Sequence, residues 1–444
     1  MTESRFRRAA LLLAVVGALH GLVYVPLVTF NVATDSGTYV ASAEALLDGS
    51  YSTPLRAGFY YVYPLGFFDI TGLQLRQTTW DAPERQVFRP PGYPLVLAAV
   101  GGGGAGASRT LALIAQGLLF GAGVWLLALT VRRWWGPGLG LLAAALYAVD
   151  PYSKHYVTLI LSEVTAGFVA LAAAYAFTRA WQTRSVGWWG LTAALAASLT
   201  LVRAVFVVAV PLVVLAALIQ QGRVRRAGAV LACSAALLGP WLAWTTSVVG
   251  TPVLASYGEG FNLLVAAHGE GQGRSFAEVI EDPAFLRDFR APHRLVPAPE
   301  RMIADPEAHP RYVERADGEQ RERAWSLLGE RLREEPHQLA WEALYRAFFL
   351  WNAHEDWYQP GGAALFLLSI ADWLVLGLAL AGAWLALRRG GPARGIAVFL
   401  LVYTATVATH HVEARFAMPV RGLFLALVAL TLADVWARRQ QRRA

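Results

Sequence analysis

Charged side chains and cysteine are both scarce in this chain of 444 residues. Charged residues make up only 16% of it, whereas a soluble protein carries about 25%. The single cysteine, Cys233, excludes a disulfide within the chain. The sequence has no internal repeat and no low-complexity tail. Since 56% of the residues are hydrophobic, several membrane spans explain the shortage of charge better than one large soluble core does.

The apolar residues gather in runs that polar connections separate. The first run, from Ala9 to about Phe30, is interpreted as a retained span, because no small-x-small cleavage site ends it and other spans follow. Further runs lie at about 109–131, 137–150, 156–180, 187–203, 204–221, 227–249, 361–387, 395–410 and 417–436. The run at 137–150 is short enough to be a tilted or incomplete span. We predict an all-α polytopic membrane protein with about ten transmembrane helices, juxtamembrane helices on the outer face and a small outer cap.

Basic residues fall on every second connection between these runs. They are Arg132 and Arg133, Arg179 to Arg184, Arg223 to Arg226, Arg388 to Arg394, and Arg438 to Arg443. The positive-inside rule places these connections and both termini in the cytoplasm, with the chain in a plasma or inner membrane. The net charge of +7 is therefore spread over separate connections. A nucleic-acid interface would need the basic residues on one soluble patch, so it is not indicated.

The same layout divides the chain into three regions. Residues 1–249 form an N-terminal transmembrane region with a first outer loop at 31–108, residues 250–360 an outer-face loop or cap, and residues 361–444 the C-terminal transmembrane helices with a basic cytoplasmic tail. Within the cap, Tyr312 to Glu335 is predicted to be helical. Leu339 to Trp351 is predicted to lie at the membrane interface, and an eleventh crossing is the alternative that would break the charge pattern.

The stretch from Asn31 to Tyr51 follows the first apolar run directly. It contains Asp35, ahead of a short amphipathic run that ends at Gly49. This pattern predicts a helix that lies along the membrane surface. The sequence leaves two interpretations of Asp35 open: a carboxylate at the mouth of a site just outside the bilayer, or only a helix cap.

Several cations share the predicted outer face with Asp35. They are Arg89 in the RPPGYP stretch, Lys154 and His155 ahead of Glu163, Arg203, and Arg415 in the HHVEARF stretch. Charged groups near a membrane are usually paired or functional. An anionic substrate with an acid–base step would need such a set, and arginine suits phosphate because its planar fork can bond two oxygens.

Each of these groups also has a purely structural interpretation. Arg89 can be an interfacial side chain that reaches for water. Lys154 can pair with Asp150 at a helical spacing, and Arg203 can pair with Glu163. His410, His411 and Glu413 resemble a metal site only weakly, because adjacent histidines point in different directions on a helix.

Motifs spread over nearly the whole chain resemble one class of enzyme. They are Asp35 with Tyr39, the RPPGYP stretch that includes Tyr93, the Arg132-Arg133-x-x-Gly136 turn, the DPYS…LSE pattern that ends at Glu163, Gly239 to Val253, and Glu413 to Pro419. Together they are similar to the GT-C class of lipid-carrier-dependent membrane glycosyltransferases. The nearest likeness is to the family 39 branch, with the protein O-mannosyltransferases and the aminoarabinose transferase of lipid A.

This resemblance implies a reaction and a set of site residues. Asp35 corresponds to the proposed catalytic base, and Arg89 to a contact of the donor phosphate. The predicted substrate-binding residues are Tyr39, Arg89, Tyr93, Lys154, His155, Glu163, Arg203 and Arg415. The donor would be a polyprenyl-phosphate-linked sugar and the acceptor a glycan, a lipid or a protein, joined by an inverting single displacement with one base.

The sequence leaves both the need for a cofactor and the choice between competing functions open. The aminoarabinose transferases have Glu-Lys-Pro where this chain has Phe88-Arg89-Pro90, so no cofactor is expected to be required, although a divalent cation remains an option. The competing functions are a transporter of lipid-linked sugars, which would place its charges near the middle of the membrane, and a polymerase or ligase of the O-antigen type.

Overall fold

The computed structural model describes residues 1–24, 35–49, 53–54, 83–84, 89–104, 106–220, 223–254, 259–270, 278–279, 282–293, 309–352 and 363–442. The long apolar helices are α1 (Glu3–Tyr24), α5 (Gly106–Trp135), α6 (Pro137–Val149), α8 (Glu163–Thr183), α9 (Val186–Val202), α10 (Ala209–Ile219), α11 (Arg223–Val249), α18 (Ala363–Arg389), α19 (Gly391–Ala408) and α20 (Arg421–Gln441). The 3-10 helices η2 (Ala204–Val208) and η3 (Ala414–Val420) precede α10 and α20.

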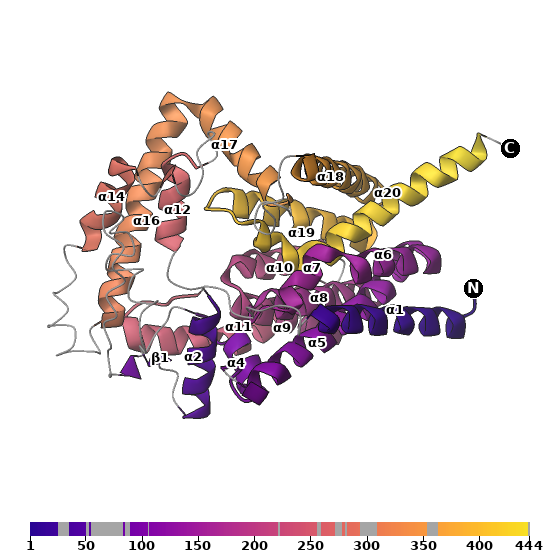
Figure 1. Cartoon of the computed structure of the whole chain (residues 1–444), viewed down its shortest axis with the longest axis horizontal. Coiled ribbons are helices and arrows are strands. Elements are labelled where there is room, and N and C mark those ends of the chain that lie inside the picture. Colours follow the sequence, from indigo (N-terminus) through magenta and orange to yellow (C-terminus); the bar gives the residue numbers. More distant parts are fainter. Residues whose placement is uncertain are drawn as a thin grey trace.

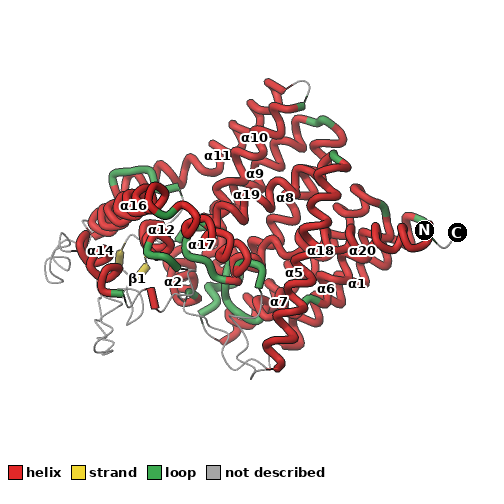
Figure 2. Tube along the Cα trace, turned by 90° about the horizontal axis from the view of Figure 1, so that it is seen from above, coloured by secondary structure: helices red, strands yellow, loops and turns green. Residues whose placement is uncertain are grey.

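Shorter elements connect these helices at one end of the bundle. They are α2 (Ser36–Leu47), α4 (Gly92–Ala99), α7 (Pro151–Val157) and the antiparallel pair of strands β1 (Thr53–Pro54) and β2 (Pro83–Glu84). The cap contains α12 (Glu259–Ala267), α14 (Pro283–His293), α16 (His309–Glu334) and α17 (Pro336–Phe349). Figures 1 and 2 show both termini at one end of the molecule and the cap at the opposite end, with α2 between the bundle and the cap.

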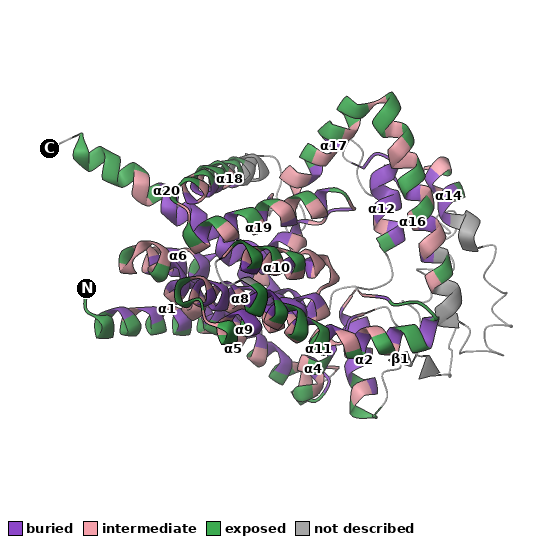
Figure 3. Cartoon of the chain, turned by 180° about the vertical axis from the view of Figure 1, so that it is seen from behind, coloured by how far each residue is buried: buried purple, intermediate pink, exposed green. Residues whose placement is uncertain are grey.

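The predicted membrane architecture is confirmed. Seven helices of the described chain are long and apolar enough to cross a membrane, and three shorter apolar helices cover Pro137–Val149, Val186–Val202 and Ala204–Ile219. Exposed leucines such as Leu12 (63%), Leu19 (56%) and Leu231 (56%) lie along these helices, and Figure 3 shows such exposed positions on α1 and α11. Large apolar side chains on the outside of a helical bundle are what lipid contact requires. The number of crossings stays a prediction.

One of the predicted apolar runs has a different boundary in the structure. The run predicted at 156–180 is not one helix: α7 ends at Val157 and α8 begins only at Glu163, so the stretch between them places polar residues beside the site described below. The cap helix predicted over Tyr312 to Glu335 is confirmed as α16. The helix α17 has 14 residues and carries exposed Trp341 and Leu344, and its position at the membrane interface stays a prediction.

Small residues let the helices of the bundle approach closely. A Cβ on Gly121 of α5 would lie 2.7 Å from the carbonyl oxygen of Ala14 in α1, and one on Gly140 of α6 would lie 2.6 Å from that of Ala128 in α5. Helix packing in a membrane relies on such close contacts, because lipid tails supply no hydrophobic drive between helices. The glycines therefore fix the spacing of α1, α5 and α6.

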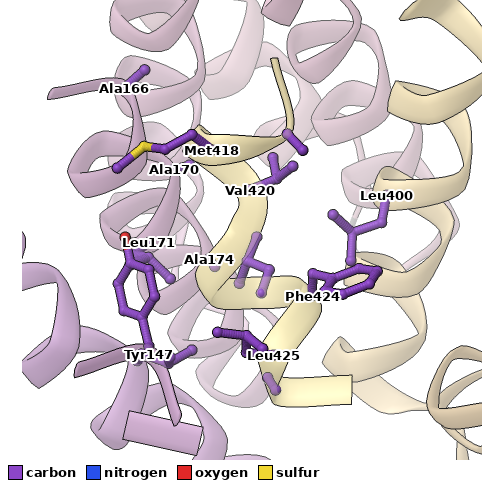
Figure 4. Packing of buried hydrophobic residues seen from close by; sticks show 14 of the residues in the cluster. Tyr147, Ala166, Ala170, Leu171, Ala174, Leu400, Met418, Val420, Phe424 and Leu425 are labelled. Atoms are coloured by element: carbon purple, nitrogen blue, oxygen red, sulfur yellow. The ribbon is translucent and has the colours of Figure 1, made fainter. Parts of the chain in front are cut away.

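The N-terminal half of helix α20 is buried in the bundle, whereas its C-terminal half extends beyond the other helices (Figure 1). Figure 4 shows Met418 of η3 beside Ala170 of α8, Phe424 of α20 beside Leu400 of α19, and Leu425 of α20 near Tyr147 of α6. The residues from Leu423 to Leu430 are at most 5% exposed. Burial of this kind is worth about 1.5–3 kcal/mol for each large side chain. Because α20 is held rigidly in this core, η3 at its N-terminal end is held in place as well.

Candidate active site

Asp35 lies between two arginines that come from distant parts of the chain. Its Oδ1 lies 2.7 Å from Nη2 of Arg89 and its Oδ2 lies 2.9 Å from Nη1 of Arg415. Asp35 occupies the N-cap position of α2, but its side chain makes no capping hydrogen bond. The interpretation of Asp35 as only a helix cap is therefore wrong in this structure, because both carboxylate oxygens face guanidinium groups.

The position of Arg89 follows from the chain around it. Pro90 and Pro91 end the preceding segment, and α4 begins at Gly92. A Cβ on Gly92 would lie 2.7 Å from the carbonyl carbon and oxygen of Leu201 at the end of α9, so only glycine permits this approach. The contact fixes the start of α4, and thereby Arg89, against the end of α9 that carries Arg203.

Two tyrosines form an aromatic wall beside Arg89. The Arg89 guanidinium lies 4.8 Å from the centre of the Tyr39 ring, and Tyr39 meets Tyr93 edge to face at 4.9 Å. The Tyr39 hydroxyl is hydrogen-bonded to Ser162 Oγ at 3.1 Å. Tyr93 is fully buried and donates to Gln116 Oε1 at 2.7 Å. Tyr39 thus contacts the charged cluster directly, whereas Tyr93 supports it from behind.

A second ion pair lies on the other side of Tyr39. Arg203 Nη1 lies 2.6 Å from Glu163 Oε1 and donates to Ser162 Oγ at 3.3 Å. The pairing of Arg203 with Glu163 that the sequence left open is therefore observed. Glu163 is only 1% exposed, and its Oε2 has no hydrogen-bond partner in the described part of the chain. A buried carboxylate oxygen without a partner is costly in free energy, so it marks a place where a ligand hydroxyl would be stabilised.

Glu413 and His411 connect this cluster to the cap. Arg415 Nη2 donates to Glu413 Oε1 at 2.9 Å, and Arg415 Nε also contacts Glu413. His411 Nδ1 lies 2.6 Å from Glu270 Oε1, and its backbone N–H donates to the carbonyl of Asn262 at 2.9 Å. His411 and Glu413 were expected only as a weak metal set, and Glu270 was not predicted at all. His410 instead contacts Thr409 Oγ1 at 2.9 Å, so the two histidines do point apart.

Lys154 and His155 have other neighbours. Lys154 is 2% exposed and its Nζ contacts the ring of His20 in α1. The alternative pairing of Lys154 with Asp150 is wrong, because Asp150 accepts from Ser153 N at 2.9 Å as the cap of α7 and pairs with Arg421 at 3.3 Å. The His155 ring lies against Tyr156. A substrate contact of Lys154 or His155 therefore stays a prediction.

The cluster contains equal numbers of arginines and acids, namely Arg89, Arg203 and Arg415 with Asp35, Glu163 and Glu413. Burial alone would raise the pKa of Asp35, but Arg89, Arg415 and Arg203 together hold that pKa well below its usual value. Burial would also raise the pKa of Glu413, yet Arg415 and His411 lower it to about 2. The pKa of His411 is raised to about 9, because Glu270 and Glu413 outweigh the effect of burial.

The arrangement suits the binding of an anion such as a phosphate. Guanidinium groups on several sides can surround an anion, and the carboxylate beside them is ionised. No group of three or more His, Cys, Asp or Glu suited to a metal ion occurs among the described residues, and the participation of a divalent cation stays a prediction.

Comparison with known proteins gives one matching family model and several similar solved structures. Residues 89–244 match the family model described as dolichyl-phosphate-mannose-protein mannosyltransferase. The oligosaccharyltransferase of Archaeoglobus fulgidus is similar in its apo form over 98% of this chain and 51% of that chain, at 13% identity and a TM-score of 0.52. In complex with an inhibitory peptide and a dolichol-phosphate, that enzyme, AglB, gives 14% identity and a TM-score of 0.54 over the same shares.

A third solved structure, ArnT from Cupriavidus metallidurans bound to undecaprenyl phosphate, is similar over 97% of this chain and 78% of that chain, at 19% identity and a TM-score of 0.37. None of the curated proteins matches this sequence. The chain spans about half the length of the archaeal oligosaccharyltransferase. The predicted GT-C resemblance is therefore confirmed at the level of the fold: the chain has the fold of the archaeal oligosaccharyltransferase, and residues 89–244 match the mannosyltransferase family model.

Proposed function

We propose that this protein is a membrane glycosyltransferase that moves a sugar from a polyprenyl-phosphate donor to an acceptor at the outer face of the membrane. The observation that carries the proposal is the Asp35 carboxylate held between Arg89 and Arg415, with Arg203 beside it. The GT-C fold supports the donor class, because the similar AglB structure contains a dolichol-phosphate. The acceptor is a glycan, a lipid or a protein hydroxyl or amine.

The reaction would be a single displacement at the anomeric carbon of the sugar. The nucleophilic atom of the acceptor forms a bond to this carbon from one side, while the bond to the phosphate oxygen breaks on the other side. The bonding electron pair leaves with the polyprenyl phosphate, and the acceptor proton passes to Asp35. Because the leaving group is a stable anion, one base is enough and the anomeric configuration inverts.

The arginines would stabilise the charge that develops on the leaving phosphate. Arg89 and Arg415 are the two nearest to Asp35, so a donor bound there keeps its reacting bond close to the base. A fixed cation stabilises a developing negative charge more strongly in a site with little water than in solution, and it needs no reorganisation during the reaction. Glu163, with one oxygen available, would accept a hydrogen bond from a hydroxyl of the sugar.

The orientation in the membrane is also part of the proposal. Both termini lie at the end opposite the cap, and the basic connections lie towards the termini in the predicted layout. We place the termini in the cytoplasm, and the cap and the site outside. A lipid-linked donor would then enter from the outer leaflet, where its phosphate is at the level of the site.

The test is consumption of donor by the intact protein. Membranes that contain the protein and its native acceptors would be given a panel of polyprenyl-phosphate hexoses and pentoses, and released polyprenyl phosphate would be measured. One donor should be consumed by the wild-type protein and not by Arg89→Ala. Arg225→Ala, an exposed arginine at the start of α11, should behave as wild type. Equal loss in both variants, or no consumption of any donor, would contradict the proposal.

A further inference from the structure

Every arginine of the candidate site already has a carboxylate partner. Arg89 contacts Asp35, Arg203 contacts Glu163, and Arg415 contacts both Asp35 and Glu413. A donor phosphodiester brings one further negative charge into this balanced cluster. The phosphodiester competes with these carboxylates for the guanidinium groups, and it gains the most charge-assisted hydrogen bonds if one carboxylate gives up its place.

Of the three carboxylates, Asp35 can move away from its arginines with the smallest loss of free energy. Glu163 belongs to the first turn of α8 and is 1% exposed, so its withdrawal from Arg203 would leave a buried charge unpaired. Glu413 is also held by His411, at 3.6 Å. Asp35 lies just before α2, its side chain is 27% exposed, and its contacts through the carboxylate are the two arginines.

The two arginines would keep their positions after Asp35 withdraws. Arg89 Nε donates to Thr38 Oγ1 at 3.2 Å and its guanidinium lies over the Tyr39 ring. Arg415 remains held by Glu413 through Oε1 at 2.9 Å. Each guanidinium therefore has one anchor that does not depend on Asp35, and the pair is arranged in advance to receive an anion.

We infer, on the basis of the proposed function, that Asp35 occupies the phosphate-binding place of the resting enzyme and that the donor phosphodiester displaces it from Arg89 and Arg415. The same exchange makes Asp35 available as a base only when a donor is present. While both of its oxygens face arginines, Asp35 binds a proton poorly. Once the phosphodiester neutralises those arginines, the proton affinity of Asp35 returns towards that of an ordinary aspartate.

The other charged groups around Asp35 are consistent with this exchange. Arg203 at the end of α9 and Glu163 at the start of α8 form their own pair, and Glu413 of the segment before η3 is shared by Arg415 and His411. Tyr39 of α2 faces Arg89 with its ring. The productive order is therefore donor first and acceptor second, since an acceptor that arrives first meets an occupied base.

The experiment measures binding of a polyprenyl methyl phosphodiester, which has one charge and no transferable sugar, to the full protein in lipid nanodiscs. Asp35→Asn should bind this probe at least about tenfold more tightly than wild type, because the internal competitor is gone. Glu413→Gln removes a carboxylate from the same cluster but loosens Arg415, so it should bind the probe no more tightly than wild type. Asp48→Asn, an exposed acid at the end of α2, is the matched control and should not change the affinity.

The outcomes separate the inference from the proposed function. If wild type binds the probe and Arg89→Ala does not, but Asp35→Asn binds no more tightly, the inference is wrong and the proposed donor class stands. If Asp35→Asn and Glu413→Gln both bind the probe more tightly, and to the same extent, net charge alone explains the change in affinity and the inference is wrong. If wild type binds the probe no better than the neutral polyprenol, both proposals fail. Asp35→Ser provides a second variant should Asp35→Asn fold poorly.

Discussion

Arg415 holds Asp35 with one side of its guanidinium group and Glu413 with the other. Nη1 lies 2.9 Å from Asp35 Oδ2, and Nη2 lies 2.9 Å from Glu413 Oε1. A lysine has a point charge and no fork, so it could not make these two contacts in one plane. Arg415 therefore connects the residue that precedes α2 to the segment that leads into η3 and α20.

This relationship leads to a prediction about Arg415→Lys. The variant keeps the charge but loses one of the two contacts, which is worth about 1.5–3 kcal/mol for a hydrogen bond to a charged group. We expect donor consumption to fall by at least about tenfold, while the protein still inserts and folds. Arg394→Lys, an exposed arginine at the start of α19, is the control. Unchanged kinetics in Arg415→Lys would show that the fork geometry is not used.

Asp35→Asn should abolish transfer without abolishing binding of the donor. The amide keeps the shape of the side chain but cannot take the acceptor proton, and loss of a general base typically lowers the rate by about 10²–10⁴. The measurement is release of polyprenyl phosphate from the donor found to be active. Asp48→Asn should retain normal turnover. Near-normal turnover of Asp35→Asn would show that Asp35 is not the general base. Loss of turnover in Asp48→Asn alone would show that the base is another residue of the same loop.

The contact of His411 with Glu270, which joins the cap to the bundle, should become weaker at alkaline pH. The pKa of His411 is raised to about 9 in the folded protein, above the ordinary value of about 6.5. A raised pKa contributes stability that is fully present below about pH 6.5 and is lost as the pH rises through about 9. Wild type should therefore lose thermal stability between pH 7 and 10 more steeply than His411→Gln. His410→Gln is the control and should keep the slope of wild type. Parallel slopes in all three proteins would contradict the role of His411.

Gly92→Ala should displace α4 and Arg89 together. The added Cβ would lie 2.7 Å from the backbone of Leu201, and overpacking of this kind typically costs about 1–3 kcal/mol. We expect a lower melting temperature and weaker binding of the polyprenyl phosphodiester. In α11, a Cβ on Gly228 meets nothing within 4 Å, so Gly228→Ala should have neither effect. Normal binding in a destabilised Gly92→Ala protein would show that Arg89 is placed by other contacts.

Much of the site could be predicted from the sequence. Asp35, Arg89, Arg203 and Arg415 are all charged residues next to apolar runs, and the alternation of basic connections puts them on one side. The structure brings them together at one end of the bundle. The pairing within the set could not be predicted, since it depends on side-chain geometry between segments far apart in the chain.

The pairing that was predicted wrongly and the contact that was not predicted also have physical explanations. The pairing of Lys154 with Asp150 assumed one continuous helix, but Asp150 is the N-cap of α7 and its carboxylate bonds to Ser153. Glu270 gave no signal, because an acid within a long polar segment looks like any solvated residue. Its partner His411 is 141 positions away. The predictions for residues 25–34, 50–52, 55–82 and 85–88, which include about half of the first outer loop, concern positions outside the described residues.

The orientation of the chain in the membrane has a direct test. Cys233 is the only cysteine, so Cys233→Ser gives a background without thiols. Glu330 is exposed on α16 of the cap, and Arg225 is exposed at the start of α11, on the predicted cytoplasmic side. Glu330→Cys should react with a membrane-impermeant maleimide in intact cells, whereas Arg225→Cys should react only after permeabilisation. The charge pattern requires this result, because basic connections stay in the cytoplasm. The reverse pattern would put the site inside the cell, where an outer-leaflet donor could not reach it.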